Sequence, residues 1–323
     1  MCTAATYHTK DHYFGRNLDL EHGYREEVTI TPRHYPFTFR CLPPVYHHFA
    51  MIGMATVADG YPLYYDATNE YGLSMAALNF PLSARYLPRI NGKKNLAPFE
   101  LIPWILGCCK SVSEAQEKIT VANITDISFS HEFPTTALHW IIADATQSIT
   151  VEPTAEGIQV YENPLGILTN EPPFPYHMMN LQNYLHITNE EAVNRFAPEL
   201  PVQVYSRGLG SMGLPGDLSS ASRFIKAAFT KEHSVSQDTE SASISQLFHI
   251  LSSVAQQQGC VKVGSLYEKT IYTSCCNTTK RIYYYTTYEN SQITGVRLNG
   301  IDLDTDNLAT FPLVKKQQIH MEN

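Results

Sequence analysis

The second residue of the chain is a cysteine, and its place next to the initiator methionine allows a particular chemistry. If Met1 is removed, Cys2 carries a thiol and a free α-amino group, a class of base whose ordinary pKa is about 7.7 to 8.0. The amine can take the thiol proton and later return a proton to the departing amine of an amide substrate. This arrangement predicts acyl transfer through a thioester. The alternative is that Cys2 is merely the small residue that follows many initiator methionines.

Two charged residues follow in the strand-like stretch YFGRNLDL, where Arg16 and Asp19 stand three positions apart. A reactive thiolate needs positive potential nearby, and an amine that acts as a base needs an acceptor that orients it. Arg16 and Asp19 meet both needs if their strand lies beside Cys2. The alternative is a surface ion pair, which contributes only about 0 to 1 kcal/mol to stability.

Six segments, spread over nearly the whole chain, resemble signatures of one enzyme family. In chain order they are MCTA, GRNLDL, NEYGLSMAALNFP, GILTNEPPF, LPGDLSSASRF and YYTTYEN. Together they resemble the choloylglycine hydrolases, a family of N-terminal-nucleophile amidohydrolases, and most closely its bile salt branch. No single segment is specific, but six in the family's order and spacing are.

The resemblance implies a role for each matching position. The implied catalytic residues are Cys2, Arg16, Asp19, Asn79, Asn170 and Arg223. Cys2 would be nucleophile and base, and the two arginines and the aspartate would surround it. An oxyanion hole would combine the backbone N–H of Asn79 with the side-chain amide of Asn170, both aimed at charge that develops on the carbonyl oxygen.

Each of these positions also has a plainer interpretation. Asn79 and Asn170 could be turn residues, because Asn bonds its own backbone and tolerates unusual dihedral angles. Arg223 could lie on the surface of a helix through SRFIKAAF, with Phe224, Ala227 and Ala228 as the buried stripe.

The substrate is inferred from the same resemblance. The bile salt branch has Asn where penicillin V acylases tend to have Tyr, and this chain has Asn79. The resemblance therefore implies hydrolysis of glycine- and taurine-conjugated bile acids. A penicillin V acylase or another N-acyl amide hydrolase of the family is the alternative. A non-enzymatic alternative is an amphiphile-binding protein, which would have no need for all six residues.

A large apolar acyl group needs a pocket lined by aromatic and aliphatic side chains near the nucleophile. The candidate lining residues are Leu18, Tyr24, Tyr65, Phe133 and Leu138, the last two at the ends of one loop. The alternative for each is ordinary packing.

Composition excludes several other functions. The formal charge of -8 and the lack of a basic run argue against nucleic acid as a partner. None of the thirteen histidines has metal-ligand spacing, and no phosphate loop or serine-hydrolase motif is present, so we expect no metal and no cofactor. The amino terminus does not resemble a signal peptide, and no segment resembles a membrane span.

Seven cysteines, including two adjacent pairs and no C-x-x-C, indicate reduced thiols and a cytoplasmic protein. The adjacent pairs are expected to be apolar fillers of the interior.

The elements that must position these residues are mostly strands. Residues 2–80 predict a meander of antiparallel hairpins that includes FTFR at 37–40, with turns at Asp59-Gly60 and Tyr71-Gly72. Residues 98–120 predict helices, the second capped by Ser111 or Ser113. Further hairpins turn near Asp144 and at Glu156-Gly157. Helices follow near 175–186, 217–231 and 243–257, an exposed loop spans 232–243, and strands end the chain.

The predicted class is α+β, as a single domain over residues 1–323. The resemblance further implies an αββα sandwich, in which two antiparallel sheets lie between helical layers, and a homotetramer.

Overall fold

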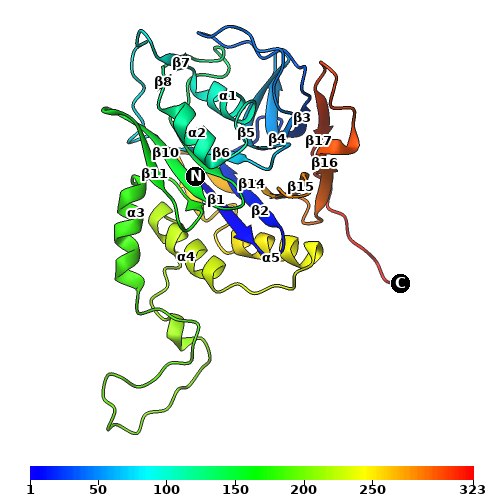
Figure 1. Cartoon of the computed structure of the whole chain (residues 1–323). Coiled ribbons are helices and arrows are strands. Elements are labelled where there is room, and N and C mark those ends of the chain that lie inside the picture. The colour runs from blue at the N-terminus through cyan, green and yellow to red at the C-terminus, as the bar shows by residue number, and fades with distance from the viewer.

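The computed structural model describes all residues, 1–323, and is built on two antiparallel sheets that face each other (Figure 1). The first sheet has the order β12-β1-β2-β14-β15-β16, and β13 pairs with β14. Its strands are β1 (Cys2–His8), β2 (His12–Leu20), β12 (Ile167–Leu168), β13 (Val261–Val263), β14 (Leu266–Asn277), β15 (Ile282–Thr287) and β16 (Thr294–Arg297).

The second sheet has the order β11-β10-β9-β6-β5-β4-β3-β17. Its strands are β3 (Glu27–Thr31), β4 (Met51–Ala58), β5 (Tyr61–Asn69), β6 (Ser74–Asn79), β9 (Leu138–Ala143), β10 (Ser148–Thr154), β11 (Gly157–Glu162) and β17 (Ala309–Pro312). A small parallel pair, β7 (Lys94–Leu96) and β8 (Ala122–Ile124), lies apart from both sheets.

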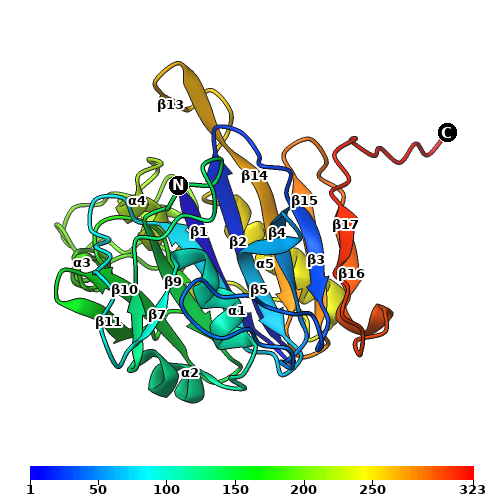
Figure 2. The same ribbon diagram turned by 90° about the horizontal axis from the view of Figure 1, so that it is seen from above.

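Helices cover the outer face of each sheet, which gives four layers, α-β-β-α (Figures 1 and 2). Helices α1 (Leu101–Leu106) and α2 (Val112–Ile119) pack on the second sheet, and α4 (Ser220–Glu232) and α5 (Glu240–Ser252) pack on the first. Helix α3 (Phe174–Leu181) packs against α4. Four short 3₁₀ turns complete the elements: Pro98–Glu100, Gln182–Tyr184, Leu209–Ser211 and Leu298–Gly300.

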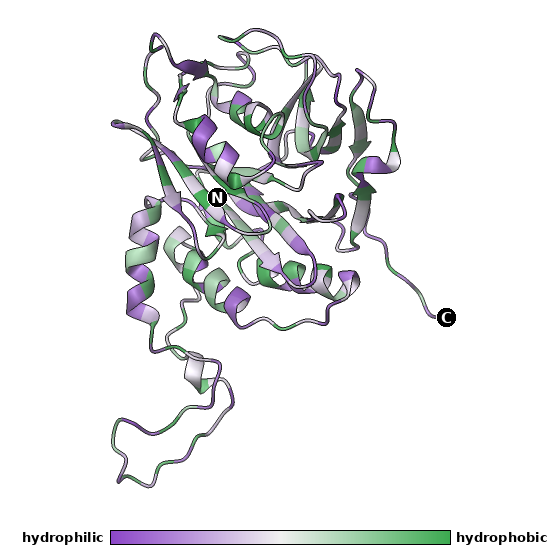
Figure 3. Ribbon diagram, viewed as in Figure 1, coloured by the Kyte–Doolittle hydropathy of each residue, from purple (hydrophilic) through white to green (hydrophobic).

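Burial on both faces explains why the central strands carry few exposed residues. Eight of the nine residues of β2 are buried, because the second sheet covers one face and α5 packs on the other. One apolar core lies between the sheets and extends under α4 and α5, and a second lies between the second sheet and α1 and α2. In Figure 3 α4 and α5 carry both hydrophobic and hydrophilic residues, as amphipathic surface helices do. The polar residues of β2 are therefore buried along with its apolar residues.

Most predicted elements are present, and four expectations need correction. The first 80 residues do not form one meander, because β1 and β2 belong to the first sheet and β3–β6 to the second. FTFR forms no strand, only an isolated bridge between Phe37 and Val45. The loop predicted for 232–243 is only 233–239, since Thr239 caps α5. Cys108 is exposed, whereas Cys109, Cys275 and Cys276 are buried as expected.

The local signals predicted turns and caps well. Ser111, one of the two candidates, accepts a hydrogen bond from the Glu114 N–H and caps α2. Gly60, Gly72 and Gly157 all have positive φ at predicted turns. These features depend only on neighbouring residues, which is why the sequence shows them.

An extended arm, residues 185–216, leaves the body of the protein after α3 and returns before α4 (Figure 1). Its one regular element is the turn Leu209–Ser211. No helix of the protein has both the length and the apolar character required to cross a bilayer.

Candidate active site

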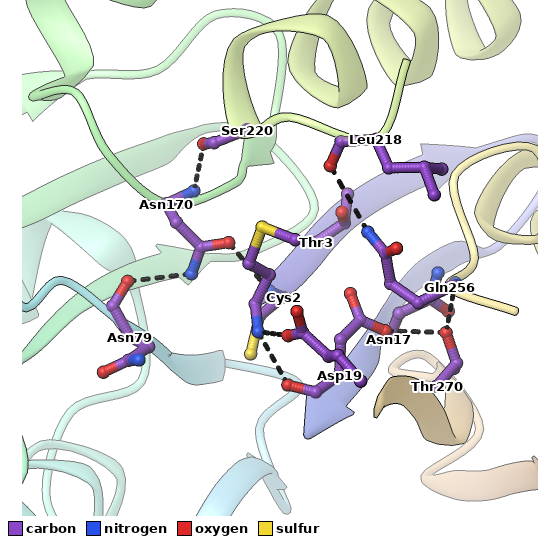
Figure 4. Close-up of polar contacts among 12 residues, drawn as sticks. Cys2, Thr3, Asn17, Asp19, Asn79, Asn170, Leu218, Ser220, Gln256 and Thr270 are labelled. Atoms are coloured by element: carbon purple, nitrogen blue, oxygen red, sulfur yellow. Dashed lines mark hydrogen bonds and ion pairs between the residues drawn. The ribbon is translucent and has the colours of Figure 1, made fainter. Parts of the chain in front are cut away.

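Cys2 begins β1 and is buried between the two sheets, only 2% exposed. Its main-chain nitrogen donates a hydrogen bond to Oδ1 of Asn170, at 2.8 Å (Figure 4). The ammonium group of Met1 donates to the carbonyl oxygen of Asp19, at 2.7 Å, and also pairs with the carboxylate of Glu268. The nitrogen that would become the α-amino group of Cys2 therefore already has a side-chain acceptor.

The orientation of the Asn170 amide is determined by its neighbours. Both the Cys2 nitrogen and Nη2 of Arg223 are donors, each 2.8 Å from the same Asn170 atom, so that atom must be the oxygen. The amide nitrogen consequently faces Asn79 and donates to its carbonyl oxygen, at 2.8 Å. One hydrogen of that NH₂ group is used in this bond, and the second is available to a substrate oxygen.

Asn79 ends β6, and strand register directs its backbone toward the same place. It pairs with Leu138 of β9, but the Leu138 N–H donates to Tyr86 Oη, whereas the next residue, Phe80, donates to the Ala137 carbonyl. Antiparallel pairs alternate between bonded and non-bonded, so the 79/138 pair is non-bonded and the Asn79 N–H and C=O point away from β9. The Asn79 N–H and the Asn170 amide thus lie on the same edge of β6.

Arg223 reaches this cluster from the first turn of α4, which Ser219 caps. Its guanidinium donates to the carbonyl of Cys2 at 2.5 Å, to Thr3 Oγ1 at 2.6 Å and to the Asn170 oxygen. Only 1% of the residue is exposed, so Arg223 is not a surface residue of the helix. Burial lowers the pKa of Arg223, and the nearby Asp19 and Cys2 oppose that shift.

Arg16 approaches from β2, fully buried, and lines the same cavity as Cys2. Its Nη1 donates to the backbone carbonyls of Tyr65, at 2.9 Å, and Ala77, at 2.6 Å, while its Nη2 has no partner in the protein. Burial alone would lower the pKa of Arg16, but the thiol of Cys2 and other anionic groups nearby raise it above its ordinary value. The guanidinium therefore stays charged beside the sulfur.

Asp19 is buried near the end of β2 and forms no ion pair with Arg16. Its Oδ1 accepts a hydrogen bond from Thr270 Oγ1, at 2.6 Å, and its Oδ2 has no partner. Burial raises the pKa of Asp19, and the charge of Arg223 is the largest effect that opposes this rise. A β-bulge immediately after Thr270 turns β14 at this point, and bulges are common beside active sites.

The five residues predicted to bind the acyl group all line one cavity of about 380 Å³, together with Cys2, Arg16 and Asn79. The five are Leu18, Tyr24, Tyr65, Phe133 and Leu138. Fifteen of its 23 lining residues are hydrophobic, which suits an apolar ligand more than a polar one. The loop 127–136 forms one wall and also contributes the acidic side chain of Glu132.

Sequence reasoning missed several polar residues that support the site. Thr270 and Glu268 stand two apart on β14, whose other polar residues, such as Lys269 and Thr273, left no local signal that would single them out. Ser220 Oγ accepts from the Asn170 N–H, at 2.8 Å, and lies within a motif already noted. His177 Nε2 lies 3.0 Å from the Asn170 carbonyl and fixes the same segment from the other side. No group of His, Cys, Asp and Glu in the structure is arranged to hold a metal ion.

Comparison with known proteins agrees with this geometry. Residues 2–311 match the family described as linear amide C-N hydrolases, choloylglycine hydrolase family. The chain belongs to the choloylglycine hydrolase family. It is 50% identical to a bile salt hydrolase/transferase from Lactiplantibacillus plantarum and 37% identical to one from Clostridium perfringens, over the full length of all three chains. The predicted family membership is therefore confirmed.

Solved structures agree as well. A crystal structure of a conjugated bile acid hydrolase variant from Clostridium perfringens matches with a TM-score of 0.93 at 36% identity, covering 100% of both chains. Penicillin V acylase from Agrobacterium tumefaciens matches with a TM-score of 0.75 at 17% identity, over 97% of this chain and 92% of that one, which is a likeness of fold. The predicted αββα sandwich of N-terminal-nucleophile hydrolases is thus confirmed, and this family member is an amidohydrolase.

Proposed function

We propose that the protein hydrolyses the amide bond of glycine- and taurine-conjugated bile acids through a thioester on Cys2. The observation that carries the proposal is that Cys2, Arg16 and Asn79 line the same mainly hydrophobic cavity. A steroid acyl group would pack against the apolar wall of this cavity, and its amide carbonyl would then lie beside Cys2, Arg16 and Asn79. The names of the relatives and the Asn at position 79 support bile salts over penicillin V.

The proposed reaction uses Cys2 for both nucleophile and base. The α-amine accepts the thiol proton, sulfur attacks the carbonyl carbon, and the negative charge passes to the carbonyl oxygen. The Asn79 N–H and the second hydrogen of the Asn170 amide stabilise that oxyanion. The C–N bond breaks as the ammonium of Cys2 returns its proton to the leaving amine, which departs as glycine or taurine. Water then attacks the thioester by the same route and releases the bile acid.

Removal of Met1 is a requirement of this proposal, because a retained methionine would hold the Cys2 nitrogen in a peptide bond. The liberated amine would keep the Asn170 oxygen as an acceptor, with the unpartnered Oδ2 of Asp19 buried in the same polar cluster. Intact mass of the active enzyme should therefore correspond to a chain that begins at Cys2. Full activity in a chain that keeps Met1 would contradict the mechanism.

Turnover of glycocholate, taurocholate and penicillin V, measured side by side, tests the substrate. We expect both bile salts to be cleaved faster, with Cys2→Ala as the inactive control. Faster cleavage of penicillin V would assign the protein to the acylase branch. Saturable binding of bile salts without any product from the processed chain would instead identify an amphiphile-binding protein.

We also propose that the chain is one domain and assembles as a homotetramer, with the arm 185–216 reaching a second copy. Eight large apolar side chains of the arm are exposed in the single chain: Leu185, Val193, Phe196, Leu200, Val202, Val204, Tyr205 and Met212. Phe196 is 100% exposed, which is unusual for an aromatic residue in a folded protein. Sedimentation of the wild type should give four chains, and Phe196→Ser with Tyr205→Ser should dissociate them. A monomeric wild type would contradict this.

The cellular location follows as a smaller proposal. All seven cysteines are free, including the buried pair Cys275 and Cys276, which supports a reducing, cytoplasmic location. No cofactor, nucleic acid or membrane partner enters the proposed reaction.

A further inference from the structure

A buried aspartate that sequence reasoning did not single out lies at the junction of the two sheets. Asp66 belongs to β5 of the second sheet and is only 1% exposed. Its carboxylate accepts hydrogen bonds from Tyr272 Oη, at 2.6 Å, Tyr283 Oη, at 2.8 Å, and Ser274 Oγ, at 3.3 Å. All three donors come from β14 and β15 of the first sheet. A carboxylate with three hydroxyl donors and no polar partner in its own sheet spans the interface between the sheets.

Two routes connect Asp66 to Arg16. Ser274 Oγ, which donates to Asp66, also accepts the backbone N–H of Arg16, at 3.2 Å. In addition, Tyr65, the residue directly before Asp66, supplies one of the two carbonyls that bind Nη1 of Arg16. Tyr65 is the extra residue of a β-bulge, since Asp66 pairs with Met54 and Tyr64 with Ala55. The carboxylate therefore anchors the short segment that receives the guanidinium.

Charge balance gives the second argument. Arg16 is completely buried, yet no carboxylate lies within ion-pair distance of it, and its bonded partners are neutral backbone carbonyls. A buried cation without a compensating anion is strongly unfavourable, because burial removes its hydration. The acidic groups that act on Arg16 are the Cys2 thiol, the Tyr272 phenol and the carboxylates of Asp66 and Asp19. Burial raises the pKa of the Tyr272 phenol, which therefore stays neutral. Burial raises the pKa of Asp66, whereas the charge of Arg16 and the hydrogen bonds from Tyr272, Tyr283 and Ser274 oppose that rise and favour the ionised carboxylate.

We propose that Asp66 is a positioning residue for Arg16: through Tyr272, Tyr283 and Ser274 it holds the segment that binds the guanidinium, and it balances the charge that Arg16 presents to Cys2. Asp66 itself does not line the cavity or touch the substrate. The inference rests on the proposed function only in taking Cys2 as the reactive thiol.

The test measures the reactivity of the Cys2 thiol directly and uses no substrate. Wild type and Asp66→Asn are alkylated with iodoacetamide over a range of pH, and the labelling rate of the peptide that contains Cys2 is followed by mass spectrometry. Asn keeps the size of the side chain, and the phenol and serine hydroxyls can rotate to accept as well as donate. Removing the negative charge leaves Arg16 less compensated and favours the thiolate. The pH of half-maximal labelling should therefore fall by about half a unit or more.

Two further variants control for folding and for charge in general. Asp59→Asn makes the same chemical change in an exposed turn at positive φ, where Asn is well tolerated, and should leave the labelling profile unchanged. Tyr283→Phe removes one donor, weakens the ionised form of Asp66 and should shift the profile in the same direction by less. This second variant keeps the proposal testable if Asp66→Asn does not fold, as judged by circular dichroism.

A labelling profile that is unchanged or moves to higher pH in folded Asp66→Asn would overturn the proposal. Hydrolysis measured in parallel separates the two ideas. If bile salts prove not to be substrates while the profile shifts as expected, the proposed substrate is wrong and the role of Asp66 stands. If bile salts are cleaved and the labelling profile does not move, the proposed substrate is right and the role of Asp66 is wrong.

Discussion

The two ends of the cavity are built differently. At the polar end, the strand residues Cys2 and Arg16 line the cavity. Behind Cys2 lie Arg223 of α4 and Asn170, two residues after β12, and hydrogen bonds of 2.5–2.8 Å join these two side chains to Cys2 and to each other. All four residues are at most 4% exposed. The apolar end relies on the loop 127–136, most of whose residues are exposed or half-buried, and its aromatic side chains pack without a comparable network. In the proposed reaction, the chemistry would therefore rest mainly on buried, hydrogen-bonded residues of strands and a helix, and the acyl group would be recognised by a loop.

This difference has a physical reason. A reacting thiol needs donors placed to within a fraction of an ångström, and paired strands together with buried hydrogen bonds provide that. An apolar ligand requires mainly that water be excluded, which a loop can do while its contacts change. Substitutions at the polar end should therefore lower kcat, and substitutions in the loop should raise KM.

The largest effect is expected from Cys2→Ala, which removes the thiol and with it the nucleophile of the proposed reaction. Hydrolysis should fall on the order of a thousandfold or more, to the background of the remaining groups. Cys2→Ser should also be greatly impaired, because a hydroxyl is far less acidic than a thiol. Release of glycine or taurine, with unchanged circular dichroism, checks this; undiminished turnover would remove Cys2 from the mechanism.

Asn170→Ala should have the second-largest effect on turnover, because it removes one of the two proposed oxyanion donors. The expected loss in kcat is about 10²- to 10³-fold, or about 2.7–4 kcal/mol of barrier, with little change in KM. Asn183→Ala, an exposed asparagine just beyond α3, is the matched control and should behave as the wild type. A change in KM alone would show that Asn170 contributes to substrate binding and not to the chemical step.

Phe133→Ala tests the apolar end and should have a smaller, different effect. The side chain lines the cavity and packs on Tyr24 and Phe129, so truncation should weaken binding by about 1 kcal/mol, or roughly fivefold in KM. Steady-state kinetics with several bile salts measure this. A comparable fall in kcat would show that the loop also positions the reacting amide.

His12→Gln should leave turnover at neutral pH unchanged and alter only stability. Burial, followed by the charge of His8, lowers the pKa of His12 from 6.5 to about 4. The unfolded chain therefore binds more protons between those values, and stability contributed by neutral His12 at higher pH is lost as pH falls from 6.5 through 4. The loss reaches roughly 3 kcal/mol. Denaturant unfolding at several pH values should show a smaller loss in the variant; parallel curves would contradict this.

Much of the site could be proposed from the sequence because its residues lie in short, recognisable segments. Turn and cap positions such as Gly72 and Ser111 were also visible, since they depend on a few neighbouring residues. The sheet to which each strand belongs was not, because β3 follows β2 in the chain without pairing with it. The supporting residues Thr270 and Asp66 were missed for the same reason: each acts across a contact between strands far apart in sequence.

The family, the candidate nucleophile and the alternation of strands and helices could all be inferred from the amino-acid sequence, because each depends on local patterns of side chains. The direction in which the Asn170 amide faces and the carbonyls that receive Arg16 could be known only from the folded chain. Those outcomes depend on how two sheets register against each other, and no local pattern encodes the distance between residues that meet only after folding.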